Sequence, residues 1–88
     1  MIQEIVDRLD AISSNVNNEP LYILGGYIVG TTIVRDDIDE LYEKYPKLEY
    51  IAELGAELET LEETEFAEPI FKRFQIALKQ FKETLKKQ

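Results

Sequence analysis

The chain contains no cysteine, no histidine and no tryptophan among its 88 residues, and these gaps exclude several classes of protein. Without cysteine or histidine there is no disulfide framework, no ordinary zinc site, and no thiolate or imidazole for nucleophilic catalysis. A di-iron bundle, which needs histidines beside its glutamates, is excluded as well. A chain this short buries only about 60 to 65% of its unfolded surface, so its core is thin. We therefore expect no cofactor, and self-association is one way to bury more surface.

The first residues lack the basic segment followed by an apolar segment that a secretory signal peptide requires. Charged and apolar side chains alternate instead over the first fifteen residues. The absence of cysteine also fits a reducing compartment. We therefore expect one cytoplasmic helical domain that spans residues 1–88.

Basic residues are scarce until the end of the chain. Residues 1–68 hold 17 acidic and 4 basic side chains, whereas residues 69–88 hold 1 acidic and 6 basic side chains. The formal net charge of the whole chain is −8. An acidic body repels nucleic-acid phosphate, so direct binding to DNA or RNA is not expected. It attracts a basic partner, its own basic tail or the tail of a second copy.

Apolar residues recur at steps of three and four in three segments, which predicts amphipathic helices at residues 2–14, 47–63 and 68–86. The second and third of these segments carry matching stripes and form an antiparallel helical hairpin. The stripes are Ile51, Leu54, Leu58 and Leu61 in one helix and Phe71, Phe74, Leu78, Phe81 and Leu85 in the other. Glutamates flank the first stripe and lysines flank the second, which favours their pairing.

The segment LYILGGYIVGTTIV, residues 21–34, carries no charged side chain. Its β-branched and aromatic residues surround Gly25 and Gly26, a pattern that permits a β-hairpin. A lone two-stranded hairpin is marginal in water, and no third strand is visible, so we favour a helix over residues 19–45, with a break near Gly30 to Thr32 as an option. The run is too short to cross a membrane, which needs about 20 residues. The predicted fold is an all-α four-helix bundle, and an α+β fold with a hairpin at 21–34 is the alternative.

Gly26 and Gly30 lie four residues apart, so on a helix they share one face and permit another backbone to approach closely. Packing inside the chain is the ordinary explanation. However, a helix that is apolar all round must be enclosed by neighbours, and three amphipathic helices offer little cover. We therefore predict a homodimer whose interface uses Leu21, Tyr22, Gly26, Tyr27, Gly30 and Ile33. Gly55 predicts a second close helix contact, because glycine costs about 1 kcal/mol relative to alanine within a helix.

Acidic residues gather directly after the apolar segment, at Asp36, Asp37, Asp39, Glu40 and Glu43. Pairs of them lie one helical turn apart, a spacing that could present carboxylates to Mg²⁺. In composition alone the set resembles the paired acidic helices of some all-helical nucleotide pyrophosphatases, with Glu57, Glu62 and Glu65 as further ligands. The simpler interpretation is a helix whose first turn favours acids and whose other carboxylates face water. We adopt it, and predict neither catalytic nor metal-binding residues.

These patterns together predict a non-catalytic helical module for protein interaction or regulation. It would bind itself as a homodimer and also bind an unidentified protein, without contacting nucleic acid or membrane. The alternative is an acidic inhibitor or immunity-type protein that covers the basic, nucleic-acid-binding surface of a partner.

Overall fold

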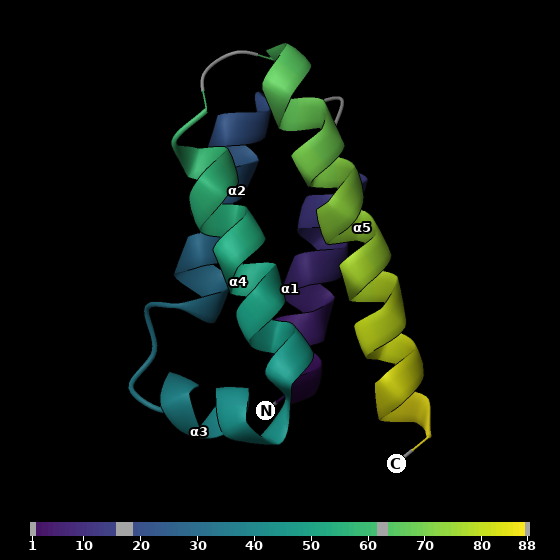
Figure 1. The fold of residues 1–88 in the computed structure, drawn as a ribbon. Coiled ribbons are helices and arrows are strands. Elements are labelled where there is room, and N and C mark those ends of the chain that lie inside the picture. The colour runs from purple at the N-terminus through teal and green to yellow at the C-terminus, as the bar shows by residue number, and fades with distance from the viewer. Residues whose placement is uncertain (1, 16–18, 62–63, 88) are drawn as a thin grey trace.

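Helices make up all the regular structure in a computed structural model of the chain, which describes residues 2–15, 19–61 and 64–87 (Figure 1). They are α1 (Ile2–Ser14), α2 (Leu21–Thr32), α3 (Ile38–Lys44), α4 (Pro46–Glu59) and α5 (Thr64–Lys86). No strand occurs in these residues. The predicted all-α fold is therefore confirmed, and the alternative with a hairpin at 21–34 is wrong.

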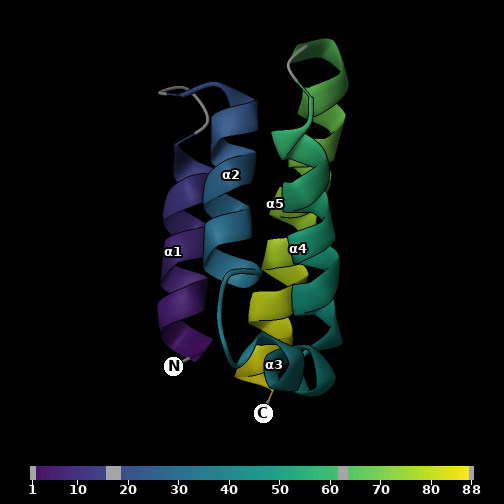
Figure 2. The ribbon, with the colours of Figure 1, turned by 90° about the vertical axis from the view of Figure 1, so that its left-hand side faces the viewer.

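The four long helices form an antiparallel bundle, and the short α3 lies across one end of it (Figures 1 and 2). α2 packs between α1 and α4, and α5 closes the bundle against α4 and α1. α4 and α5 form the predicted antiparallel hairpin, since the Lys47 ammonium near the start of α4 donates a hydrogen bond to Gln80 Oε1 near the end of α5, at 3.1 Å. Within the described residues, no helix has the length and apolar character needed to cross a membrane.

The core consists of the residues that the three- and four-residue periodicity turns inward. The largest of its fully buried side chains are Phe74 and Phe81. Phe81 meets Tyr45 edge to face, with ring centroids 5.7 Å apart. Tyr45 follows the last residue of α3, and Pro46 begins α4, which confirms the predicted helix end before the proline.

The closest helix crossing joins α2 to α4 at Gly25 and Gly55. A Cβ atom on Gly25 would lie 2.6 Å from the Glu59 backbone nitrogen, and one on Gly55 would overlap the Ile28 side chain. Real Cβ atoms do not approach other heavy atoms this closely, so both positions require glycine. The close contact predicted at Gly55 is confirmed. Within α2 it is Gly25, rather than Gly26 or Gly30, that permits the approach.

The single helix predicted over residues 19–45 is wrong, because α2 ends at Thr32 and α3 begins at Ile38. A continuing helix would offer the Thr32 carbonyl to the amide four residues later, but that carbonyl accepts a hydrogen bond from the Tyr42 hydroxyl at 2.8 Å. The Arg35 side chain bonds to Asp37 at 3.0 Å within the turn that follows. These contacts stabilise the interruption, which lies just beyond the optional break near Gly30 to Thr32.

α5 begins at Thr64, four residues before the predicted start, and α4 ends at Glu59 rather than at residue 63. The extra turn of α5 places Ala67 in the core, where it is 1% exposed, and leaves Pro69 exposed. A proline inside a helix removes one backbone hydrogen bond, here the bond to the Glu65 carbonyl. Residues 64–67 lie outside both predicted helices, and this prediction is wrong, because α5 runs through them and continues past Pro69. Asn18 stands two residues before Pro20, where the sequence predicts that it could cap the helix that follows, and it lies outside the described residues.

Candidate interaction surface

Among the described residues, the large apolar side chains that remain exposed lie on two separate surfaces. Four belong to α2 and the residues after it, namely Tyr22, Tyr27, Ile33 and Val34. The other three, Tyr50, Phe66 and Ile76, belong to α4 and α5. Exposed apolar residues that are scattered singly are ordinary on proteins, whereas contiguous ones mark interaction sites. The two surfaces are therefore the candidate sites, and the one on α2 contains five of the six interface residues predicted from the sequence.

The α2 surface lies opposite the residues that α2 buries. Leu24 and Ile28 point into the core with no exposure, whereas Tyr22 and Ile33 are each 40% exposed and Val34 is 72% exposed. Tyr22, Gly26, Gly30 and Ile33 follow one another at steps of four, four and three, so they share one side of the helix. With Tyr27 and Val34 at its edge, we call this set the α2 outer face. It contains no charged side chain.

Nothing in the described part of the chain requires glycine at positions 26 and 30. A Cβ atom on Gly30 would meet no atom within 4 Å, and one on Gly26 would meet only the end of the flexible Glu59 side chain, at 3.5 Å. Neither glycine has a positive φ angle. Each nevertheless costs about 0.5 to 1 kcal/mol of stability relative to alanine. Packing between the described helices explains why glycine is needed at positions 25 and 55. It does not explain glycine at positions 26 and 30.

The structure brings five of the six predicted interface residues onto the α2 outer face: Tyr22, Gly26, Tyr27, Gly30 and Ile33. Leu21 lies apart from them, because its side chain packs against the core next to Phe71 and Gln75 of α5. Val34 belongs to the surface but was absent from the prediction. It ends the same charge-free run in the sequence, which is the signal that would have found it.

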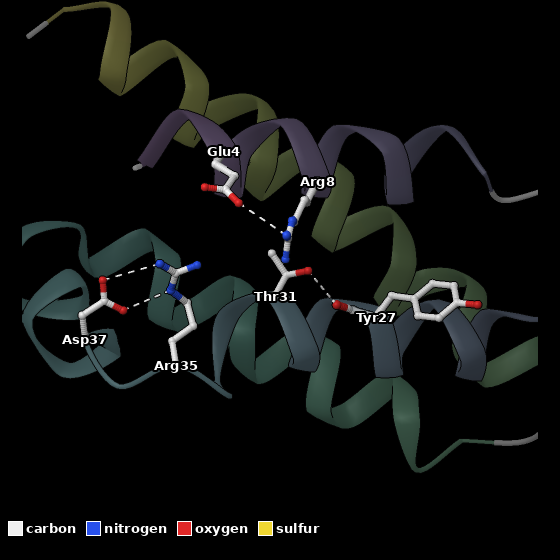
Figure 3. Close-up of polar contacts among 6 residues, drawn as sticks. All are labelled: Glu4, Arg8, Tyr27, Thr31, Arg35 and Asp37. Atoms are coloured by element: carbon white, nitrogen blue, oxygen red, sulfur yellow. Dashed lines mark hydrogen bonds and ion pairs between the residues drawn. The ribbon is translucent and has the colours of Figure 1, made fainter.

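Charged residues border α2 on the neighbouring α1 and beyond its C-terminal end (Figure 3). On α1, Arg8 pairs with Glu4 at 3.3 Å, and beyond the end of α2 Arg35 pairs with Asp37 at 3.0 Å. The hydrogen bond from Arg35 lowers the pKa of Asp37, and the same contact raises the pKa of Arg35, to which the nearby Glu4 adds a smaller effect. Each arginine is therefore matched by a carboxylate, and the border carries little net charge at this end.

Tyr27 contacts the loop that precedes α2. Its hydroxyl donates a hydrogen bond to Glu19 at 3.2 Å, and this bond, followed by the negative charge of Glu19, raises the pKa of Tyr27. The carboxylate of Glu59 reaches the edge of the face at Gly26. A partner that approaches Gly26 therefore meets the Glu59 carboxylate, and one that approaches the Tyr27 hydroxyl meets the Glu19 carboxylate.

The acidic residues considered as a metal site form no such site in the described residues. No group of three or more acidic side chains there is arranged to hold a metal ion. Asp37 is occupied by Arg35, while Asp36, Asp39, Glu40 and Glu43 are exposed. Of the further ligands considered, Glu57 and Glu65 are exposed on different helices, and Glu62 lies outside the described residues.

Comparisons with known proteins assign the chain to no family. It matches no protein-family model, no curated protein and no solved structure. Its function must therefore be inferred from its own residues and contacts.

Proposed function

We propose that the chain is a non-catalytic, cytoplasmic helical module for protein interaction, and that it forms a homodimer through the α2 outer face. The observation that carries the proposal is the pair Gly26 and Gly30, which lowers helix stability and is required by no contact among the described residues. Glycines at this spacing permit a second helix backbone to approach closely. The cost in helix stability is thereby offset in the dimer.

A second copy fits the α2 outer face because the face is free of charge. In a two-fold symmetric interface, residues near the axis meet their own counterparts, so a charged residue there would face the same charge. No charged residue occurs in positions 21–34, although 32% of the whole chain is charged. Tyr22 and Ile33, toward opposite ends of the face, provide apolar contact on either side of the glycines.

The expected dimer is weak and depends on concentration. α2 has 12 residues, so it is about 18 Å long and presents a single helix face to the partner. Such a contact falls at the small end of specific interfaces, which bury about 800 Å² on each partner. The two copies also repel each other, because each carries a formal net charge of −8.

Sedimentation equilibrium of the wild type and of Gly30→Leu tests the proposal. The wild type should shift from monomer to dimer as its concentration rises, and Gly30→Leu should stay monomeric because the leucine separates the two backbones. Open space around Gly30 means that the variant should keep the helical circular dichroism spectrum of the wild type. A wild type that stays monomeric at millimolar concentration would show the proposed dimer to be wrong.

A second candidate function rests on the acidic surface of α3 and α4. Exposed carboxylates cover this region, namely Asp36, Asp39, Glu40, Glu43, Glu49, Glu53 and Glu57. They suit an inhibitor that covers the basic, nucleic-acid-binding surface of another protein. Association steered by charge slows steeply as ionic strength rises, whereas binding to an apolar face changes little. A pull-down from the native host at low and high salt separates the two, because only an electrostatically held partner is lost at high salt.

A further inference from the structure

The second apolar surface lies in the groove between α4 and α5, which run side by side on the face shown in Figure 1. This groove has a volume of about 380 Å³ and is lined by Lys47, Tyr50, Arg73, Ile76, Ala77 and Gln80. None of these residues belongs to α2, so the α4–α5 groove is independent of the proposed dimer interface.

Its apolar part is contributed by both helices. Ile76 is 58% exposed and Tyr50 is 41% exposed, while the small buried Ala77 forms the floor. Phe66, which is 56% exposed, precedes Arg73 by seven residues on α5. Seven residues are close to two helical turns, so Phe66 lies on the same side of α5 as Arg73, outside the lining of the groove. A ligand can thus bury apolar groups against Tyr50 and Ile76 without any change in the core.

Its charged part is entirely basic. Lys47 and Arg73 are the charged residues of the lining, which contains no carboxylate. The Lys47 ammonium lies 5.6 Å from the centre of the Tyr50 ring and bonds the neutral Gln80, and Arg73 makes no ion pair with any described residue. Both cations are therefore available to a ligand. A groove lined by one sign of charge concentrates its field, even on a molecule whose net charge is opposite.

We propose that the α4–α5 groove binds a short acidic, amphipathic helical segment of another protein. One face of such a segment would place large apolar side chains against Tyr50 and Ile76, and its carboxylates would pair with Lys47 and Arg73. The guanidinium of Arg73 suits a carboxylate because the two planar groups can form two parallel hydrogen bonds. A short segment fits better than a nucleic acid, since a long polyanion would also run over the acidic remainder of the molecule.

The probe is a fluorescein-labelled synthetic helical peptide of about 15 residues, with leucine and phenylalanine on one face and glutamates beside them. Fluorescence anisotropy should show saturable binding to the wild type, and Arg73→Glu and Ile76→Ser should each weaken it about tenfold. Lys79→Glu is the matched control. It makes the same change of charge on α5, but Lys79 does not line the groove, so binding should stay within about twofold.

Several results would overturn the proposal. They are no binding of the peptide, equal losses in Arg73→Glu and Lys79→Glu, equal binding of a peptide with lysines in place of the glutamates, or binding of a single-stranded oligonucleotide in place of the peptide. Arg73 and Ile76 are exposed, so both variants should keep the wild-type circular dichroism spectrum. Gly30→Leu should bind the peptide as the wild type does, which separates this groove from the dimer interface.

Discussion

Gly25 and Gly30 lie on the same helix, yet they are glycine for different reasons. At Gly25 an added Cβ would meet the backbone of Glu59 and the Cβ of Leu58, neither of which can move without shifting α4. At Gly30 the same atom would meet open space. One glycine is needed to fold the chain, and the other is available for a partner.

Alanine substitutions should therefore change the free energy of unfolding in opposite directions at the two positions. Gly25→Ala should destabilise the protein by about 1 to 3 kcal/mol, because the added methyl group overpacks the crossing. Gly30→Ala should stabilise it by about 0.5 to 1 kcal/mol, through higher helix propensity alone. Denaturant unfolding followed by circular dichroism at low concentration, where the monomer dominates, measures both. A neutral Gly25→Ala would contradict the close crossing.

The Tyr42 hydroxyl stabilises the interruption between α2 and α3 through a single hydrogen bond. The hydroxyl bonds to the Thr32 carbonyl, and the pKa of Tyr42 is raised by burial and then by the charges of Glu49, Asp39 and Glu53. A raised folded-state pKa means that the neutral phenol stabilises the fold. This contribution is complete below the unfolded pKa of about 10 and is lost as the pH rises through the folded value.

Tyr42→Phe should accordingly cost about 1 kcal/mol at neutral pH, the usual contribution of one hydrogen bond. The difference from the wild type should shrink above pH 10, where the wild-type phenol ionises. Urea unfolding at a series of pH values from neutral to alkaline measures it, with Tyr22→Phe as the control, because Tyr22 is exposed and its hydroxyl bonds to no described residue. A difference that stays constant through the alkaline range would argue against this role for the hydroxyl.

Among the helices, α3 has the fewest buried contacts with the rest of the molecule. It has seven residues and none of them is buried, although Ile38 and Leu41 touch the core in part. α2 and α4, by contrast, each contribute several fully buried side chains. A short helix with few buried contacts opens locally at low free-energy cost.

Hydrogen exchange should therefore rank the helices. The amides of α3 should exchange fastest after the helix ends, and those in the middle of α2 and α4, around Ile28 and Ile51, should exchange slowest. Nuclear magnetic resonance at residue resolution measures this order. Protection of α3 equal to that of α4 would mean that the end of the bundle is held more firmly than its contacts indicate.

The sequence predicts α1, α4 and α5 well, because each has a polar side that defines where its apolar stripe points. α2 has no polar side, so its periodicity does not reveal which of Gly25, Gly26 and Gly30 faces α4. Neighbouring residues of a helix point about 100° apart, so the rotation of α2 about its axis decides which glycine faces α4. Packing against the other helices sets this rotation. The interruption after Thr32 depends on Tyr42, ten residues away, which local pattern does not reveal. Tyr50 and Ile76 line the α4–α5 groove together because of the register in which α4 and α5 pack, and the sequence pattern does not specify that register.

For the whole molecule, net charge and apolar contact act in opposite directions on self-association. Two copies with a formal charge of −8 repel each other, and salt screens that repulsion. If the α2 outer face joins the copies, the dissociation constant should therefore fall as ionic strength rises from about 0.05 M to about 0.5 M. Sedimentation equilibrium at the two ionic strengths measures it. A dimer that weakens with salt would indicate that the acidic body binds the basic end of α5 in the other copy instead.

The crossing of α2 and α4 also limits how this sequence can diverge. Gly25 and Gly55 are thirty positions apart, and each fits only because of what stands opposite it. A larger residue at position 55 requires a smaller one at position 28, and a larger residue at position 25 requires α4 to move away. Substitutions at these positions should therefore occur in pairs. Two small residues at this separation, each on the buried side of a helix, are the signature by which a distant relative of the chain would be recognised.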